Sequence, residues 1–269
     1  MSSAHRPAHR PPPFFIVGCV RSGTTLLRDA LRMHPNLACP EETHFFRWGE
    51  PFGTEQSSRV LTNNVVLKRH REIDGISESE FKAMLGVSTS RAELYTRYMA
   101  LYAKRNKPGA TRWFDKTPQN IYGALLAASS MQKAKFVHIV REPINVVASL
   151  RIGRVVKVEN LVGACNYWVE AVQIAAGLKR AYPGRFYEFR YEDFVRQPLP
   201  QLELLLGFLG EQFDPTWFSK LNTREVDHQQ EGVLSAEELA QVHKLCDAVR
   251  QRYGYELAPA TEPDATARP

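Results

Sequence analysis

The chain has 269 residues, 43% of them hydrophobic and 24% charged, which suits one α/β domain with a large core spanning residues 1–269. The net charge of +6 favours an anionic ligand, but no dense run of Lys and Arg marks a nucleic-acid-binding arm. Composition therefore predicts a focused anion site and excludes nucleic acid as the expected partner.

Cysteine spacing and hydropathy exclude further classes. The four cysteines are far apart in sequence and form none of the close pairs of zinc or redox motifs, so we expect reduced, buried thiols and no metal. The N-terminus lacks the apolar core of a signal peptide, and no stretch is long enough to span a bilayer. We expect loose tails at residues 1–12 and 258–269, and a cytoplasmic, bacterial protein.

The first predicted elements are a buried strand over residues 14–17 and a helix from residue 24, joined by a glycine-containing loop. Gly18 and Gly23 allow a tight turn and close approach to a ligand. The free N–H groups of residues 22–25 then converge with the positive end of the helix dipole. The loop is expected to bind an anion, typically a phosphate, through a set that includes Arg21, Ser22, Gly23, Thr24 and Thr25. A plain turn capped by Ser22 or Thr24 is the alternative.

This loop departs from the P-loop of nucleotide-hydrolysing enzymes at one informative position. Thr24 stands where that pattern places a Lys. The departure argues against ordinary ATP or GTP hydrolysis.

An acidic segment follows a short second strand predicted at residues 37–39. Glu42 and His44 are expected at the carboxyl edge of the sheet, where open α/β folds bind ligands. A carboxylate or imidazole within hydrogen-bond reach of a hydroxyl can act as a general base, and Glu42 is the leading candidate. Alternatively, the carboxylates cap a following helix.

Two further strand ends carry basic residues. Lys116 ends a strand that is predicted to stop at Pro118, and a helix is predicted from Asn120 onward. At this strand end the ammonium of Lys116 can neutralise charge on a transferring group. Arg141 ends a buried strand over residues 135–140, at the place where P-loop kinases need a magnesium-binding Asp. Arg141 and Ser149, two helical turns further on, suit a second phosphate. An ion pair of Arg141 with Glu142 or another acid is the alternative.

The remaining segments are less informative. Residues 47–112 are polar and weakly patterned, with helices expected at residues 77–85 and 91–104. A long helix is predicted over residues 159–180, a strand over 185–194, and further helices at 202–209 and from 235. The segment 222–232 is polar and contains Arg224 and His228.

These motifs, in this order, resemble the sulfotransferases that use 3′-phosphoadenosine-5′-phosphosulfate (PAPS), especially the protein-tyrosine and Golgi-carbohydrate branches and their bacterial relatives. The resemblance covers roughly residues 14–200. It implies an α/β, P-loop-like three-layer fold with a central parallel sheet flanked by helices. It also implies that the insert at residues 47–112 helps to build the acceptor pocket. Related enzymes cover the cofactor with a loop near residues 222–232, so the resemblance makes this segment a candidate lid, with Arg224 and His228 as its candidate residues.

The resemblance implies a role for each matching residue. Arg21 and the loop would bind the 5′-phosphosulfate, Glu42 would be the base, and Lys116 would contact the sulfuryl group. Arg141 and Ser149 would bind the 3′-phosphate of PAPS, and Tyr191, in an Arg-Tyr-Glu-Asp segment, would lie near the nucleotide; simple core packing of Tyr191 is the alternative. The product would be 3′-phosphoadenosine-5′-phosphate (PAP).

Several alternatives stay open at this stage. A P-loop kinase of a small hydroxyl compound and a non-catalytic adenosine-bisphosphate-binding protein are the rival functions. Peptide tyrosine, a carbohydrate, and a small alcohol or phenol are the candidate acceptors. The sequence does not decide between a monomer and a homodimer.

Overall fold

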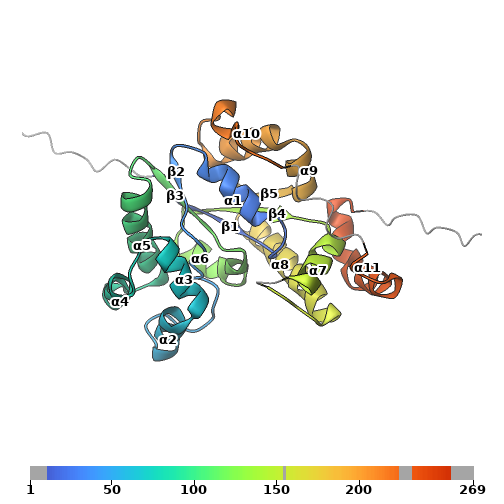
Figure 1. Ribbon diagram of the computed structural model, residues 1–269, viewed down its shortest axis with the longest axis horizontal. Helices are drawn as coiled ribbons and strands as arrows, with labels where there is room; N and C mark the ends of the chain where they lie inside the picture. The colour runs from blue at the N-terminus through green and yellow to red at the C-terminus, as the bar shows by residue number, and fades with distance from the viewer. Residues whose placement is uncertain (1–10, 154–155, 224–231, 256–269) are drawn as a thin grey trace, which may run out of the picture.

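The structure is a computed structural model that describes residues 11–153, 156–223 and 232–255 (Figure 1). Its centre is a parallel sheet with the strand order β2-β3-β1-β4-β5. The register places Phe14 of β1 beside Phe114 of β3 and Lys135 of β4. The strands are β1 (Phe14–Val17), β2 (Leu37–Ala38), β3 (Arg112–Lys116), β4 (Lys135–Val140) and β5 (Phe186–Arg190).

Helices cover both faces of this sheet, because alternate residues of a strand point to opposite faces. Phe14 and Ile16 pack into one apolar cluster, and Phe15 and Val17 pack into another. The first cluster lies under α1 (Thr24–Arg32), α9 (Tyr191–Arg196) and α10 (Pro198–Leu209). The second includes residues of α5 (Arg91–Asn106), α6 (Ala124–Ser130), α7 (Pro143–Ile152), α8 (Leu161–Ala181) and α11 (Ala236–Arg250). The three-layer α/β fold expected from the sequence is confirmed.

The insert between β2 and β3 contains two helices that the sequence analysis did not predict. They are α2 (Glu55–Asn63) and α3 (Val65–Ile73), which precede the predicted α4 (Glu78–Val87) and α5. Asn64 ends α2 and caps α3, since its side-chain oxygen accepts hydrogen bonds from the N–H groups of Val66 and Leu67 at 3.0 and 3.2 Å. The two helices bury few side chains, and this leaves their apolar pattern weak.

Two boundaries differ from the predictions. The strand expected over residues 185–194 ends at Arg190, and Tyr191 begins helix α9. The helix expected after Pro118 starts as the 3₁₀ turn η1 (Pro118–Gly123) before α6. Short 3₁₀ turns also occur at η2 (Pro183–Arg185), η3 (Pro215–Phe218) and η4 (Gln251–Tyr253).

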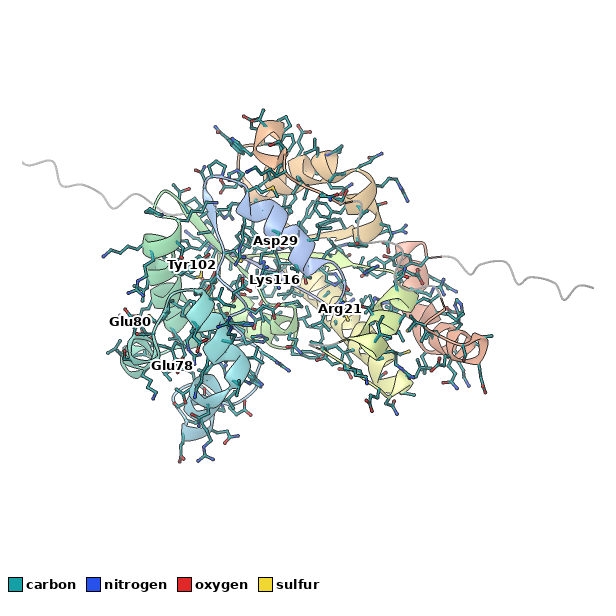
Figure 2. All side chains as sticks on the ribbon, in the orientation of Figure 1. Arg21, Asp29, Glu78, Glu80, Tyr102 and Lys116 are labelled. Atoms are coloured by element: carbon teal, nitrogen blue, oxygen red, sulfur yellow. The ribbon has the colours of Figure 1, made fainter. Side chains whose placement is uncertain are left out.

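The carboxyl ends of all five strands carry residues singled out in the sequence. Gly18 follows β1, Lys116 ends β3, Arg141 follows β4 and Tyr191 follows β5, while Glu42 lies four residues beyond β2. Parallel strands place these ends at one edge of the sheet, the usual ligand edge of such folds. In Figure 2, Arg21 and Lys116 lie towards the middle of the molecule, whereas Glu78 and Glu80 lie on the outlying α4.

Candidate functional site

The anion loop connects β1 to α1 and has a backbone that depends on glycine. Gly23 has φ +87°, and a Cβ there would lie 2.2 Å from the ring of Tyr191. Gly18 has φ +145°, and a Cβ there would lie 2.7 Å from the ring of His138. Both positions therefore exclude a side chain, and the loop lies directly against residues of β4 and α9.

The loop hydroxyls do not cap the helix. Gly23 is the N-cap of α1, and no side-chain hydrogen bond caps this end within the described residues. Ser22 and Thr24 are buried, and Thr25 is exposed at the first turn. The alternative of a turn capped by Ser22 or Thr24 is therefore not what the structure contains, and the first-turn N–H groups are free of a capping side chain.

Arg21 adopts a left-handed backbone with φ 69°, a conformation that costs free energy for a residue other than glycine. Its exposed side chain extends to α7, where Nε donates a hydrogen bond to Ser149 Oγ at 2.8 Å. The anion loop and the first turns of α7 are thus joined by a direct contact.

Arg141 lies at the end of β4, beside this contact. Its Nη1 donates to the carbonyl oxygen of Arg21 at 3.4 Å, and its guanidinium lies 4.4 Å from the centre of the Tyr191 ring. Its Nε and Nη2 are buried and have no hydrogen-bond partner among the described residues. Glu142 instead lies beside Arg250, 3.7 Å from Nε, so the expected alternative of an Arg141–Glu142 pair does not occur. A buried guanidinium with two unpaired donors is suited to an anion.

Glu42 and Lys116 form the second part of the site. Lys116 Nζ, at the end of β3, makes an ion pair with Glu42 Oε1 and donates a hydrogen bond to Thr25 Oγ1 at 3.3 Å. Glu42 caps no helix, because the described residues that follow it run as loop and turns to Thr54. The ammonium of Lys116 therefore lies between the carboxylate and the anion loop.

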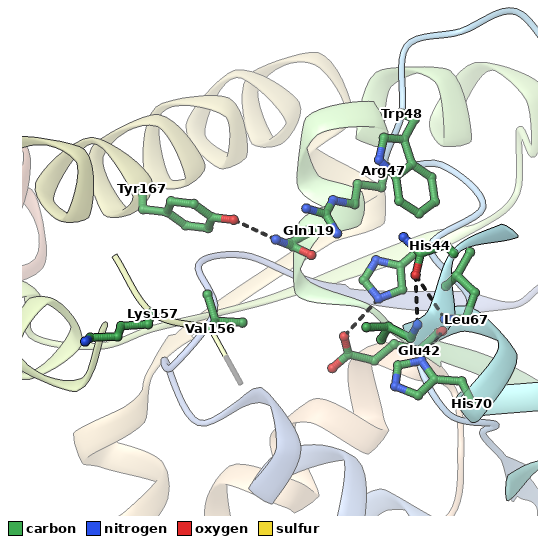
Figure 3. A pocket seen from close by; sticks show the side chains of 12 residues that line it. Glu42, His44, Arg47, Trp48, Leu67, His70, Gln119, Val156, Lys157 and Tyr167 are labelled. Atoms are coloured by element: carbon green, nitrogen blue, oxygen red, sulfur yellow. Dashed lines mark hydrogen bonds and ion pairs between the residues drawn. The ribbon is translucent and has the colours of Figure 1, made fainter. Parts of the chain in front are cut away.

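His44 contacts the other carboxylate oxygen of Glu42. Its Nε2 lies 3.3 Å from Glu42 Oε2, and its backbone is left-handed with φ 55° (Figure 3). The backbone N–H of His44 donates to Thr117 Oγ1 at 3.4 Å. The imidazole of His44 stacks on that of His70, with 6.0 Å between the ring centres. His70 Nδ1 in turn bonds the carbonyl oxygen of Glu42 at 2.9 Å. Contacts from several elements thus fix the Glu42 segment.

These contacts set the charge of the pair. Burial would raise the pKa of Glu42, but the hydrogen bond from His44 and the charge of Lys116 outweigh it and lower the pKa to about 2. Burial lowers the pKa of His44 below its ordinary value of 6.5, against the opposing effect of Glu42. At neutral pH Glu42 is therefore a carboxylate and His44 a neutral imidazole.

A buried network that the sequence analysis missed holds this segment in place. Asp115 is fully buried in β3 and accepts hydrogen bonds from Thr43 Oγ1 and from Thr117 Oγ1, the latter at 2.6 Å. Asn120 donates to Asp115 Oδ2 at 3.4 Å and accepts from the N–H of Phe46 at 3.2 Å. Burial raises the pKa of Asp115 to about 6. An acidic residue next to Lys116 at the end of β3 is the one sign of this network in the sequence. Its partner Thr43 is 72 positions away, so the sequence does not show the contact.

The neighbouring Glu41 has a structural environment. Its carboxylate pairs with Arg28 at 2.8 Å and with Arg32 at 3.2 Å. It points to helix α1, so the two adjacent carboxylates differ in what they contact.

A cavity of about 370 Å³ opens beside Glu42 and His44, and we call it the inner chamber (Figure 3). Helix α3 contributes Leu67 and His70 to its wall. On the opposite side, Gln119 of η1 donates a hydrogen bond to the hydroxyl of Tyr167 on α8 at 2.6 Å. The unpredicted α3 therefore forms part of the chamber that contains the candidate base.

The candidate lid residues Arg224 and His228 lie outside the described residues. Within the described ranges, no group of three or more His, Cys, Asp and Glu side chains could hold a metal ion. No described helix has the length and apolar character needed to cross a membrane.

A strand-loop-helix anion site without the P-loop Lys, next to a carboxylate and an ammonium, defines a P-loop-like group-transfer protein. The sequence profile described as "Sulfotransferase family" matches residues 12–215. The chain therefore belongs to the sulfotransferase family and is an enzyme of the PAPS-dependent class.

Known proteins agree with this placement. The omega-hydroxy-beta-dihydromenaquinone-9 sulfotransferase Stf3 of Mycobacterium tuberculosis is 24% identical over 91% of this chain and 76% of its own length. The sulfotransferase domain of the Synechococcus PCC 7002 olefin synthase superposes with a TM-score of 0.68 at 22% identity, covering 96% of this chain and 100% of that domain. Mouse sulfotransferase SULT7A1, solved with PAP, gives 0.54 at 13% identity over 91% and 86% of the two chains. At these identities the solved structures support the fold.

Proposed function

We propose that the enzyme transfers the sulfuryl group of PAPS to a hydroxyl group held in the inner chamber, leaving PAP. The observation that carries this proposal is the position of Lys116. Its ammonium contacts Glu42 on the chamber side and Thr25 on the anion loop. A hydroxyl acceptor in the chamber and a donor on the loop would thus meet beside one cation.

The residues around the anion loop fit such a donor. The two unpaired donors of Arg141, together with Ser149, provide a site for the 3′-phosphate. Arg21, the N–H groups of Ser22 and Gly23 in the loop, and those of Thr24 and Thr25 in the first turn of α1 would hold the 5′ end. The ring of Tyr191 packs against Gly23 and Arg141, so it would help to hold both residues in position for the nucleotide. PAPS supplies the activated sulfuryl group when it is bound.

Glu42 is the residue proposed to accept the proton of the acceptor hydroxyl. Its carboxylate is ionised at neutral pH and borders the chamber. Lys116 helps to keep the pKa of Glu42 low, so displacement of the ammonium toward Thr25 would make the carboxylate a stronger base. Lys116 and Arg21 would stabilise negative charge on the donor side, and no metal is needed for this role.

The class of acceptor is inferred from the name of a relative. The relative Stf3 is named for a hydroxylated dihydromenaquinone, which supports a hydroxyl acceptor here. Peptide tyrosine, a carbohydrate and a small alcohol or phenol all remain candidates, and a homodimer stays a prediction.

Calorimetry with PAP and with adenosine 5′-phosphate tests the donor assignment. We expect PAP to bind at least about tenfold more tightly, because charged hydrogen bonds to the 3′-phosphate contribute about 1.5–3 kcal/mol. Equal affinities would remove the donor assignment. Radiolabelled PAPS incubated with the enzyme and a cell lysate then identifies the labelled acceptor.

Two rival functions predict other outcomes in the same assays. Magnesium-dependent turnover of ATP would favour a kinase. Tight PAP binding without label transfer to any acceptor would favour a nucleotide-binding protein without catalysis.

A further inference from the structure

A second cavity adjoins the inner chamber and shares two residues with it. This outer groove has a volume of about 420 Å³ and is lined by residues of the segment after His44, of η1 and of α6. Arg47 and Trp48 line both cavities, and the Arg47 guanidinium lies 5.2 Å from the centre of the Trp48 ring. The two spaces therefore meet at the Arg47–Trp48 pair.

The outer groove is apolar where the inner chamber is polar. Its wall presents Tyr122, Leu125 and Leu126, which are 41%, 64% and 44% exposed. Leu125 and Leu126 of α6 lie three and four positions after Tyr122 of η1, so both can lie on the same side of this helical segment as Tyr122. Large apolar side chains gathered at an exposed hollow mark a binding surface more often than isolated ones do.

Backbone packing fixes this groove relative to the candidate base. A Cβ at Gly123 would lie 1.7 Å from the carbonyl oxygen of Phe46, so η1 sits directly on the segment that follows Glu42 and His44. Tyr122 also makes an edge contact with Tyr167, a residue of the inner chamber, at 6.4 Å. The groove and the chamber are thus parts of one rigid arrangement.

We propose that the acceptor is an amphipathic alcohol, with its hydroxyl beside Glu42 and an apolar chain that passes the Arg47–Trp48 pair into the outer groove. This inference rests on the proposed function, since it names the acceptor class of the same site. The argument for the occupant is adjacency: the apolar groove and the polar chamber share Arg47 and Trp48 in their walls, so a molecule that reaches across this pair would contact both. A compact polar acceptor would leave the groove unused.

A series of straight-chain primary alcohols from butanol to decanol, assayed with radiolabelled PAPS, tests the proposal. We expect kcat/KM to rise about fourfold for each methylene that enters the groove and then to level off. In the Leu126→Asp variant this dependence should flatten, because a carboxylate then faces the apolar chain. The matched control is Leu204→Asp, a change at a 60% exposed leucine on α10, and it should keep the wild-type dependence.

A binding measurement keeps the test decisive if turnover of simple alcohols is slow. Decanol added to the PAP complex should change the tryptophan fluorescence, and this change should be lost in Trp48→Phe. The change should be weaker in Leu126→Asp than in Leu204→Asp. No chain-length dependence in turnover or binding, or efficient sulfation of a tyrosine peptide instead, would overturn the amphipathic acceptor. PAP affinity is measured alongside. If the wild-type enzyme does not bind PAP, the proposed function itself is overturned. If it binds PAP but shows no dependence on chain length, only the amphipathic acceptor is overturned.

Discussion

The side chain of Arg21 donates from Nε to the hydroxyl of Ser149 at 2.8 Å and so joins the anion loop to helix α7. From sequence, the two residues are expected at opposite ends of a nucleotide, in two separate anion sites. In the structure they are in contact, and Arg141 bonds the carbonyl oxygen of Arg21 as well. A change at one end is therefore expected to affect the other.

Replacing Ser149 with Ala should weaken PAP binding by about tenfold, since it removes a hydroxyl for the 3′-phosphate and leaves Arg21 without its partner. Adenosine 5′-phosphate should lose less affinity. Titration calorimetry measures both ligands, with the exposed Ser219→Ala as the matched control. Equal losses for the two ligands would show that Ser149 acts only by holding the loop.

Glu42→Gln should lower the rate of transfer by about 10²- to 10⁴-fold, because the amide cannot accept the hydroxyl proton. PAP binding should survive, as the carboxylate lies on the chamber side of Lys116. The neighbouring Glu41→Gln serves as the control, since that carboxylate pairs with Arg28 and Arg32. Loss of PAP binding in Glu42→Gln would move this residue out of the base role.

Glu42 should also make stability depend on pH. Its folded-state pKa of about 2 lies below the ordinary value of 4.5, so its contribution is present above about pH 4.5 and is lost as the pH falls toward 2. Urea unfolding of the wild type and of Glu42→Gln between pH 7 and pH 3 measures this. The wild type should lose stability relative to the variant on acidification; a constant difference would contradict the lowered pKa.

Asp115 should have the opposite pH dependence. Burial raises its pKa to about 6 from an ordinary 3.8, so the folded state binds this proton more tightly than the unfolded chain. Its contribution is therefore fully present below about pH 3.8 and declines as the pH rises to about 6. In Asp115→Asn this component should vanish from urea unfolding curves. An unchanged pH dependence in the variant would contradict the assignment.

Removal of metal ions should leave transfer unaffected, because Lys116 and Arg21 are proposed to supply the positive charge that a metal would otherwise provide. Rates measured in the presence and absence of EDTA test this expectation. A loss of rate in EDTA that magnesium restores would bring the kinase alternative forward.

The sequence predicted the strand ends at which the candidate site residues lie, because buried parallel strands are apolar runs and their ends follow from the pattern. It did not predict helices α2 and α3, since Val65 and Val66 are exposed and few of the other side chains pack inward. The contribution of His70 to the inner chamber was missed with them. Local sequence carries no signal for such a surface insert.

Tertiary contacts explain the other misses. Tyr191 continues an alternating pattern, yet it begins α9 because its ring packs under Gly23 and Arg141. The Asp115 network links residues that are 72 positions apart, as with Thr43, so no short motif could reveal it. The strand ends that carry the candidate residues were predictable, whereas the contacts that orient these residues were not.

The place of β1 in the middle of the sheet has a consequence for synthesis. Phe14 pairs with Phe114 on one side and with Lys135 on the other, so neither neighbour exists when β1 leaves the ribosome. The nascent chain must carry an apolar strand with unpaired edges through the translation of the whole insert, a state prone to aggregation. We expect expression yield to depend on chaperone supply and translation speed before residue 140 is made, even for variants whose finished fold is stable.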